Sequence, residues 1–123
     1  MILNNDFYYI TNILYSGTLP NYRIRLNPQH YIFKAHFPGN PIVPGVCQVK
    51  IISELIEKYL GRRVVLSGIK NIKYLSVIIP SDDEILDIVF QKISIDEMGV
   101  KSVVCIMSDT KQYAKISLSY IYQ

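Results

Sequence analysis

Residues 36 to 54 read HFPGNPIVPGVCQVKIISE, and this stretch decides the fold. Its first ten residues hold three of the chain's six prolines and two of its six glycines, a composition that predicts a stiff loop. The residues after Pro44 form the longest apolar run with the length of a helix. The stretch therefore predicts a rigid loop that brings His36 to the start of a helix, which is one way to build a site.

The helix is predicted to run from about Pro44 to Leu60. Proline suits the first turn, where its missing N–H is not needed, and Gly61 suits the C-cap. At roughly 100° per residue, the polar residues of this segment fall on one arc: Lys50, Ser53, Glu54, Glu57 and Lys58. Almost all the other residues are apolar, so the helix is predicted to be largely buried.

Aromatic and β-branched segments on both sides of the helix predict strands. Residues 6–15 and 19–26 form a predicted hairpin, and residues 31–33 a short extended or turn segment. Four further strands are predicted at 64–79, 85–95, 100–108 and 113–122, and an antiparallel meander is their most economical topology. One apolar helix with six or so strands is stable only if a curved sheet wraps the helix. The uncovered side of the helix then needs a partner chain or a tunnel, so we expect a dimer.

Length and composition indicate a single globular domain over residues 1–123. Half of the residues are apolar and a fifth are charged. Cys47 and Cys105 sit in apolar runs without metal-ligand spacing and are predicted to be reduced core residues. No targeting signal opens the chain, and no apolar run approaches the ~18 residues of a membrane span, so we expect a cytoplasmic protein.

The net charge of +3 is too small to indicate nucleic acid binding, but the charges are unevenly distributed. Residues 50–73 carry six bases against two acids, whereas residues 82–97 carry six acids against one base. The basic stretch is either a face for an acidic partner or ordinary solvated surface.

Two segments resemble one family. HFPGNPIVPGV at 36–46 resembles the HFPGxPxxPGV signature of the 3-hydroxyacyl-[acyl carrier protein] dehydratases, and GIKNIKYLSVIIPSDDEI at 68–85 is similar to that family's strand after the helix. The resemblance covers residues 6 to 121 and implies an α+β hotdog fold, an antiparallel sheet wrapped around one long central helix, paired into dimers. It implies a lyase that dehydrates a 3-hydroxyacyl thioester to the 2-enoyl thioester in fatty acid or polyene lipid synthesis. The substrate would be carried on the phosphopantetheine of acyl carrier protein, without a metal or redox cofactor.

The family's reaction needs a base for the proton next to the thioester carbonyl and an acid for the departing hydroxyl. The resemblance implies that His36 is the base, since a neutral imidazole suits this task near neutral pH. The free N–H groups of Gly45 and Val46 at the helix start would stabilise the charge on the thioester oxygen. Phe37 and Gln48 are the other expected substrate contacts.

The sequence departs from the family at the acid. The family's carboxylate lies fourteen residues after the histidine, and this position is Lys50. Three explanations are open. In the first, Lys50 is buried enough to lower its pKa and itself donates the proton to the hydroxyl. In the second, Glu54, one helical turn further on, donates it through a water that Lys50 helps to place. In the third explanation dehydration is lost, and the chain binds acyl thioesters or forms the non-catalytic half of a heterodimer. Gln48, opposite the polar arc, would be a buried amide that orients substrate or water, or that bonds a backbone carbonyl.

The expected partners follow from the same resemblance. Arg62, Arg63, Lys70 and Lys73 are the candidates to meet an acidic carrier protein. The resemblance implies a homodimer with the site at its interface, where His36 comes from one chain and the Lys50/Glu54 face from the other. A higher oligomer and a heterodimer with another hotdog protein are the alternatives. An acyl thioesterase is the alternative activity.

Overall fold

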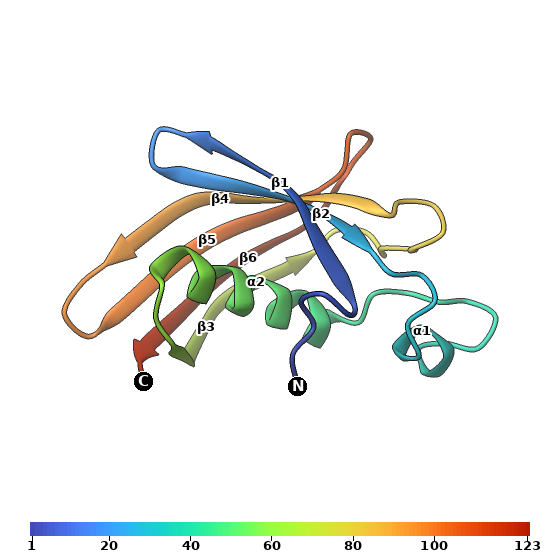
Figure 1. Cartoon of the computed structure of the whole chain (residues 1–123), viewed down its shortest axis with the longest axis horizontal. Coiled ribbons are helices and arrows are strands. Elements are labelled where there is room, and N and C mark those ends of the chain that lie inside the picture. The colour runs from blue at the N-terminus through green and yellow to red at the C-terminus, as the bar shows by residue number, and fades with distance from the viewer.

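The computed structural model describes every residue from 1 to 123, and a single long helix, α2 (Gly45–Leu60), lies at its centre. Six strands form one sheet: β1 (Tyr8–Ser16), β2 (Leu19–Leu26), β3 (Val64–Tyr74), β4 (Ile85–Ile95), β5 (Gly99–Met107) and β6 (Gln112–Tyr122). In Figure 1, α2 lies along one side of the curled sheet. This arrangement confirms the predicted hotdog fold.

The sheet is antiparallel throughout, and its strand order is β1-β2-β4-β5-β6-β3. Strands β4 to β6 form the predicted meander, but β3 pairs with β6 at the far edge instead of with β4. The meander prediction is wrong at this strand because the connection through α2 carries the chain from one part of the sheet to its opposite edge. As a result β3 is an edge strand beside the helix.

Register shifts curl the sheet around the helix. They fall between Ile10 and Asn12 in β1, at two places in β3, and between Phe90 and Lys92 in β4. A further shift falls between Ile106 and Met107 in β5. Such shifts are β-bulges or similar irregularities, and a bulge bends the strand and increases its twist. A bent, twisted sheet has a concave face, and this face holds the core.

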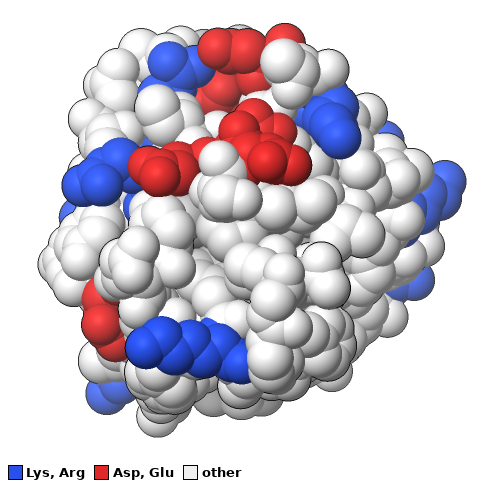
Figure 2. Space-filling view, turned by 90° about the vertical axis from the view of Figure 1, so that its right-hand side faces the viewer, with Lys and Arg blue, Asp and Glu red and all other residues white.

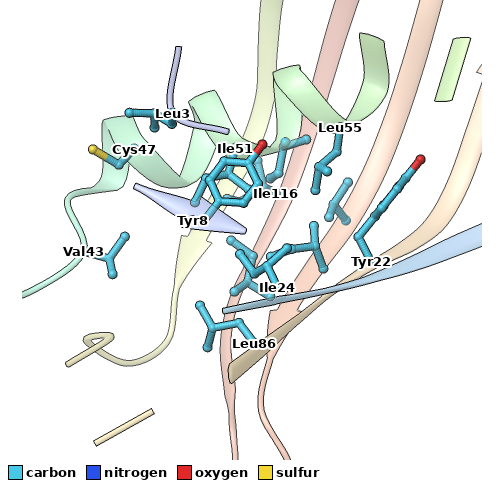
Figure 3. Packing of buried hydrophobic residues seen from close by; sticks show 14 of the residues in the cluster. Leu3, Tyr8, Tyr22, Ile24, Val43, Cys47, Ile51, Leu55, Leu86 and Ile116 are labelled. Carbon is cyan, nitrogen blue, oxygen red and sulfur yellow. The ribbon is translucent and has the colours of Figure 1, made fainter. Parts of the chain in front are cut away.

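The core lies between α2 and the concave face. Ile51, Ile52, Leu55 and Ile56 of the helix are each 1% exposed or less. Figure 3 shows side chains of the helix meeting side chains from the strands, with the Tyr8 ring directed at the helix. At about 25 cal/mol per Å² of apolar surface, burial of these side chains is the main stabilising contribution. Cys47 and Cys105 are buried with free thiols, as predicted.

One predicted element ends where the sequence indicates, and two others differ from the prediction. Gly61 is the C-cap of α2 with a φ of 69°, as its position predicts. The strand predicted over 64–79 ends at Tyr74, because the chain then leaves the sheet and the Ile78 carbonyl bonds the proline loop at Val43. Residues 31–33 are not extended, since α1 (Ile32–Ala35) forms a short helix there. Neither helix has the length and apolar character required to cross a bilayer.

Candidate active site

The proline loop, residues 36–44, is fixed by backbone hydrogen bonds at both ends. The Ile42 N–H donates to the His36 carbonyl at 2.9 Å, and the Val43 N–H donates to the Ile78 carbonyl at 2.9 Å. Together with its three prolines, these bonds hold the loop against the first turn of α2. The loop therefore gives His36 a defined position beside the helix, as the sequence predicts.

The His36 side chain is exposed and lines a hollow of about 240 Å³ with Val46 and Cys47 from the first turn of α2. Its ring makes no hydrogen bond within the chain. The other histidine, His30, is buried and uses both ring nitrogens: Nδ1 accepts from the Ile32 N–H at 3.2 Å and Nε2 lies 3.1 Å from an Asp6 oxygen. His36 is thus the histidine whose ring is free to act on a ligand.

The N-terminus of α2 presents unused donors next to this hollow. The N–H groups of Gly45 and Val46 make no hydrogen bond, whereas those of Cys47 and Gln48 bond the Pro44 carbonyl at 3.0 and 3.1 Å. Such free N–H groups carry the positive end of the helix dipole. They are suited to a developing negative charge on an oxygen atom.

Tyr74 occupies the space that Gly45 leaves open, and sequence reasoning missed it. A Cβ atom at position 45 would lie 2.5 Å from the Tyr74 hydroxyl and 2.9 Å from its ring carbon Cζ. The absence of a side chain at Gly45 therefore allows a phenol ring to pack against the helix backbone. The sequence signal was the aromatic residue at the end of β3, but its contact with the helix depends on the strand's edge position.

Lys50 and Glu54 are not paired with each other. The Glu54 carboxylate accepts from the Leu3 N–H at 2.7 Å, the Asn4 N–H at 2.8 Å and the Tyr8 hydroxyl at 2.9 Å. Within the chain, Lys50 therefore does not hold Glu54 in place. Lys50 is half-buried and forms no ion pair or hydrogen bond.

Gln48 is buried, as its angle on the helix predicts, with 4% of its surface exposed. Its Nε2 donates to the Val43 carbonyl at 3.4 Å, and its Oε1 accepts no hydrogen bond. Phe37 is half-exposed, and its ring centroid lies 5.5 Å from that of His36. The expected substrate contacts therefore surround the first turns of α2, whereas Glu54 holds the N-terminal segment.

Cys47 is the one cysteine that lines the His36 hollow. Burial raises the pKa of its thiol above the ordinary value. The thiol is therefore protonated near neutral pH, and a protonated thiol is a poor nucleophile. No cluster of three His, Cys, Asp or Glu side chains is arranged to hold a metal ion.

The four expected carrier contacts lie in two places. The Arg62 guanidinium stacks 3.6 Å from the centre of the Tyr122 ring, and Arg63 precedes β3. Lys73 pairs in register with Lys115, which alternates with buried residues of β6 and so points away from α2. Lys70 lines a shallow hollow on the same outer face with two further lysines.

We call this surface the lysine face: Lys70, Lys73, Lys92, Lys101 and Lys115. All five are exposed, and none forms an ion pair. Sequence reasoning found two of them and missed the three that the strand register adds. Acidic side chains gather elsewhere, at the end of the molecule in Figure 2, where one hollow is lined by Asp82, Asp83, Glu84, Asp87 and Asp109.

Several known dehydratases are similar to this chain in sequence. The model of a family described as ApeI-like, ApeI dehydratase, matches residues 16–114. The 3-hydroxyacyl-[acyl-carrier-protein] dehydratase FabZ of Clostridium acetobutylicum is 33% identical over 69 residues, covering 50% of this chain and 49% of that protein. FabZ of Latilactobacillus sakei is 26% identical over 87 residues, covering 65% and 61%. The chain thus spans about half to three fifths of the length of these curated relatives.

Solved structures share the fold. The dehydratase heterocomplex ApeI:P from Xenorhabdus doucetiae aligns with a TM-score of 0.68 at 17% identity, covering 92% of this chain and 96% of that one. A hypothetical thioesterase with coenzyme A from Streptococcus pneumoniae aligns with a TM-score of 0.64 at 15% identity, covering 99% and 93%. At these identities the likeness establishes the hotdog fold alone.

Proposed function

Because this chain belongs to the ApeI-like dehydratase family, we propose that it removes water from a 3-hydroxyacyl thioester to give the 2-enoyl thioester. One observation carries the proposal: the free ring of His36 lies in a hollow with the first turn of α2, whose N–H groups at Gly45 and Val46 have no partner. A base beside an oxyanion-binding site is what removal of a proton next to a carbonyl requires.

In the proposed reaction, His36 takes a proton from the carbon next to the thioester carbonyl. Negative charge moves to the thioester oxygen, where the helix N-terminus stabilises it. The bond from the third carbon to its hydroxyl then breaks, and the hydroxyl leaves as water after receiving a proton. The reaction needs no metal or redox cofactor, and the carrier brings the acyl group on its phosphopantetheine.

We assign the proton donor to Lys50 rather than to Glu54. Both Glu54 oxygens are occupied by donors from the N-terminal segment and from Tyr8. Lys50 occupies the family's acid position and has no partner within the chain. It does not line the His36 hollow of its own chain, so in the proposed dimer it serves the substrate held at His36 of the partner subunit. An ammonium group on a flexible stem has three protons to offer and needs only to reach the leaving hydroxyl.

We also propose that the chain works as a dimer formed through β3. The free edge of β3 lies beside a groove that is almost wholly apolar and contains Val46, Leu66, Ile69 and Tyr74. Val46 is 76% exposed and Ile69 is 56% exposed. Covering such a surface with a second subunit removes apolar area from water and pairs an open strand edge. The occupant is a second copy of this chain, and a heterodimer with another hotdog protein is the other outcome of the test.

The lysine face supports an acidic partner, and the substrate's carrier is the partner we propose. Five unpaired lysines on one sheet face form a positive field that attracts an acidic protein. Arg62 is less suited to this role, since its guanidinium is already stacked on Tyr122.

The activity is tested by incubating the chain with a 3-hydroxyacyl carrier protein and following loss of water by mass spectrometry of the carrier. His36→Ala should lower turnover by about 10²–10⁴-fold, the usual contribution of a general base. Lys50→Met should lower turnover, while Lys50→Arg, which keeps the charge, should retain more of it. Glu54→Gln serves as the matched comparison on the next helical turn.

Three outcomes separate the alternatives. A wild-type chain that binds the acyl carrier without converting it would establish a binding module and overturn the enzyme. Free acid and thiol as products would identify a thioesterase. Activity that appears only after adding a second hotdog protein would identify one half of a heterodimer.

A further inference from the structure

A second cavity lies beside the first turn of α2, apart from the His36 hollow. Its volume is about 330 Å³, and its walls are mainly apolar, formed by the proline loop and the segment that follows β3. Three polar side chains reach it: Gln48, Tyr74 and Ser76. A mainly apolar cavity with a few polar groups is the usual form of a binding site for a small ligand group.

Gln48 supplies an acceptor that nothing in the chain satisfies. Its Nε2 donates to the Val43 carbonyl, and this contact fixes which end of the amide faces that carbonyl. The Oε1 is buried without a hydrogen-bond partner, and only 4% of the residue is exposed. Buried polar atoms are nearly always paired, so this oxygen calls for a donor from outside the chain.

Tyr74 supplies a donor at the other side of the cavity. Its ring packs on Gly45, which has no side chain to prevent this approach, and its hydroxyl makes no hydrogen bond. Tyr74 is half-exposed, and the partial burial of its hydroxyl raises the pKa of that group, so it stays protonated over the whole neutral range. The hydroxyl is therefore a permanent donor beside the unused N–H groups of Gly45 and Val46.

The cavity and the His36 hollow lie on either side of the apolar groove along β3, and each shares lining residues with that groove. The apolar groove along β3 includes Gly45 and Tyr74, which also line the cavity, and Val46, which also lines the His36 hollow. A ligand group held at Gly45 is thus one residue along the same helical turn from the hollow that holds the base.

We propose that this cavity binds the reacting end of a 3-hydroxyacyl thioester, with Tyr74 as a further catalytic residue. The Tyr74 hydroxyl and the Gly45 N–H donate hydrogen bonds to the thioester oxygen, and the Gln48 Oε1 accepts one from the 3-hydroxyl. The inference rests on the proposed dehydration and names the residues that recognise its substrate.

The chemistry assigns each group one task. His36 takes the proton from the second carbon, and Tyr74 keeps its own proton while its hydrogen bond to the thioester oxygen strengthens as charge develops there. The third carbon loses its hydroxyl, which leaves as water with a proton from Lys50 of the partner subunit, because the Lys50 of the same chain lies on the helix face opposite Gln48. Gln48 transfers no proton and orients the hydroxyl that leaves.

Tyr74→Phe is the direct test, since it keeps the ring seated on Gly45 and removes only the hydroxyl. It should lower kcat by about 10²-fold, the usual effect of removing one oxyanion donor, with little change in KM or melting temperature. Tyr59→Phe, which removes a hydroxyl bonded to the Thr18 carbonyl far from the cavity, is the matched control and should leave kcat unchanged. A Tyr74→Phe enzyme with the kcat of the wild type would overturn the role of Tyr74.

Gln48→Leu tests recognition of the hydroxyl by binding alone. It should weaken binding of a 3-hydroxyacyl carrier by about tenfold and leave binding of the saturated acyl carrier unchanged, because only the first ligand has a donor for Oε1. Equal effects on the two ligands would overturn the role of Gln48. If the wild type binds but does not dehydrate, the proposed function fails, and this comparison still decides whether the cavity recognises the hydroxyl.

Discussion

At the scale of single residues, Glu54 illustrates how one carboxylate can be given two different roles. Its position one turn after Lys50 indicates an acid, whereas its three hydrogen bonds attach the N-terminal segment to α2. Two of the donors are backbone N–H groups, and a backbone group cannot be recognised as a hydrogen-bond partner from the residue types in a sequence. The assignment of Glu54 therefore depends on where Leu3 and Asn4 lie.

Glu54→Ala is expected to lower the free energy of unfolding by about 2–3 kcal/mol. The change leaves two N–H groups and the Tyr8 hydroxyl without their charged acceptor. Urea denaturation measures the loss, and Tyr8→Phe, which removes one of the three bonds, should cost less. A variant with full stability and no dehydratase activity would instead make Glu54 the acid.

Buried tyrosines make the protein sensitive to high pH. Burial raises the pKa of Tyr120 to about 12 and that of Tyr22 to about 12, against an ordinary value near 10. The pKa of each tyrosine is higher in the folded state than in the unfolded state, so the folded state holds its proton more tightly. The resulting contribution to the free energy of unfolding is complete below pH ~10 and is lost as the pH rises towards 12. Urea denaturation between pH 9 and 12 should show a falling free energy of unfolding. Tyr120→Phe should make that fall shallower, by up to about 1.4 kcal/mol per pH unit, and an unchanged slope would contradict the assignment.

At the scale of elements, the end of α2 depends on the backbone conformation of one glycine. Gly61 has a φ of 69°, and a Cβ there would meet no atom within 4 Å. Gly61→Ala should therefore cost about 1 kcal/mol through left-handed strain alone, measured by urea denaturation. Gly68→Ala is the control, because its Cβ would only touch the Ser119 Cβ at 3.9 Å without such strain. Equal losses from the two variants would rule out this explanation.

The outer side of the sheet carries the lysine face, and its role can be tested without touching the active site. Lys92→Glu with Lys101→Glu should weaken binding of the acyl carrier by about tenfold at low salt, and less at high salt, where charges are screened. Titration by fluorescence anisotropy measures the affinity. Lys58→Glu, an exposed lysine at the end of α2, is the matched control. Unchanged affinity in the double variant would show that the lysine face does not bind the acyl carrier.

At the scale of the whole molecule, the apolar groove between α2 and β3 determines whether the chain acts alone. Ile69→Asp should convert the dimer to a monomer in size-exclusion chromatography with light scattering, because it places a charge in a surface that must lose water on pairing. Ile95→Asp offers a close control, since both isoleucines are 56% exposed and Ile95 lies on β4 instead of β3. A wild-type monomer, or a dimer that survives Ile69→Asp, would contradict the β3 interface.

The sequence alone determined the helix, its glycine cap, the stiff loop that positions His36, and the burial of Gln48. These features depend on neighbours along the chain: proline spacing, helical periodicity and the identity of the residue at each turn. The hotdog fold could be predicted because the motif at 36–46 resembles a family signature. The same motif fixes the spacing from His36 to the acid position, so the replacement of a carboxylate by Lys50 is visible in the sequence itself.

Only the tertiary structure decided which groups meet across long sequence separations. The pairing of β3 with β6 set Tyr74 beside Gly45, the fold of the N-terminus gave the Glu54 carboxylate three donors, and strand register gathered five lysines on one face. None of these contacts follows from local periodicity, because each depends on which strand lies at which edge. Strand order is set by the packing of the whole sheet around α2, which no single segment of sequence determines.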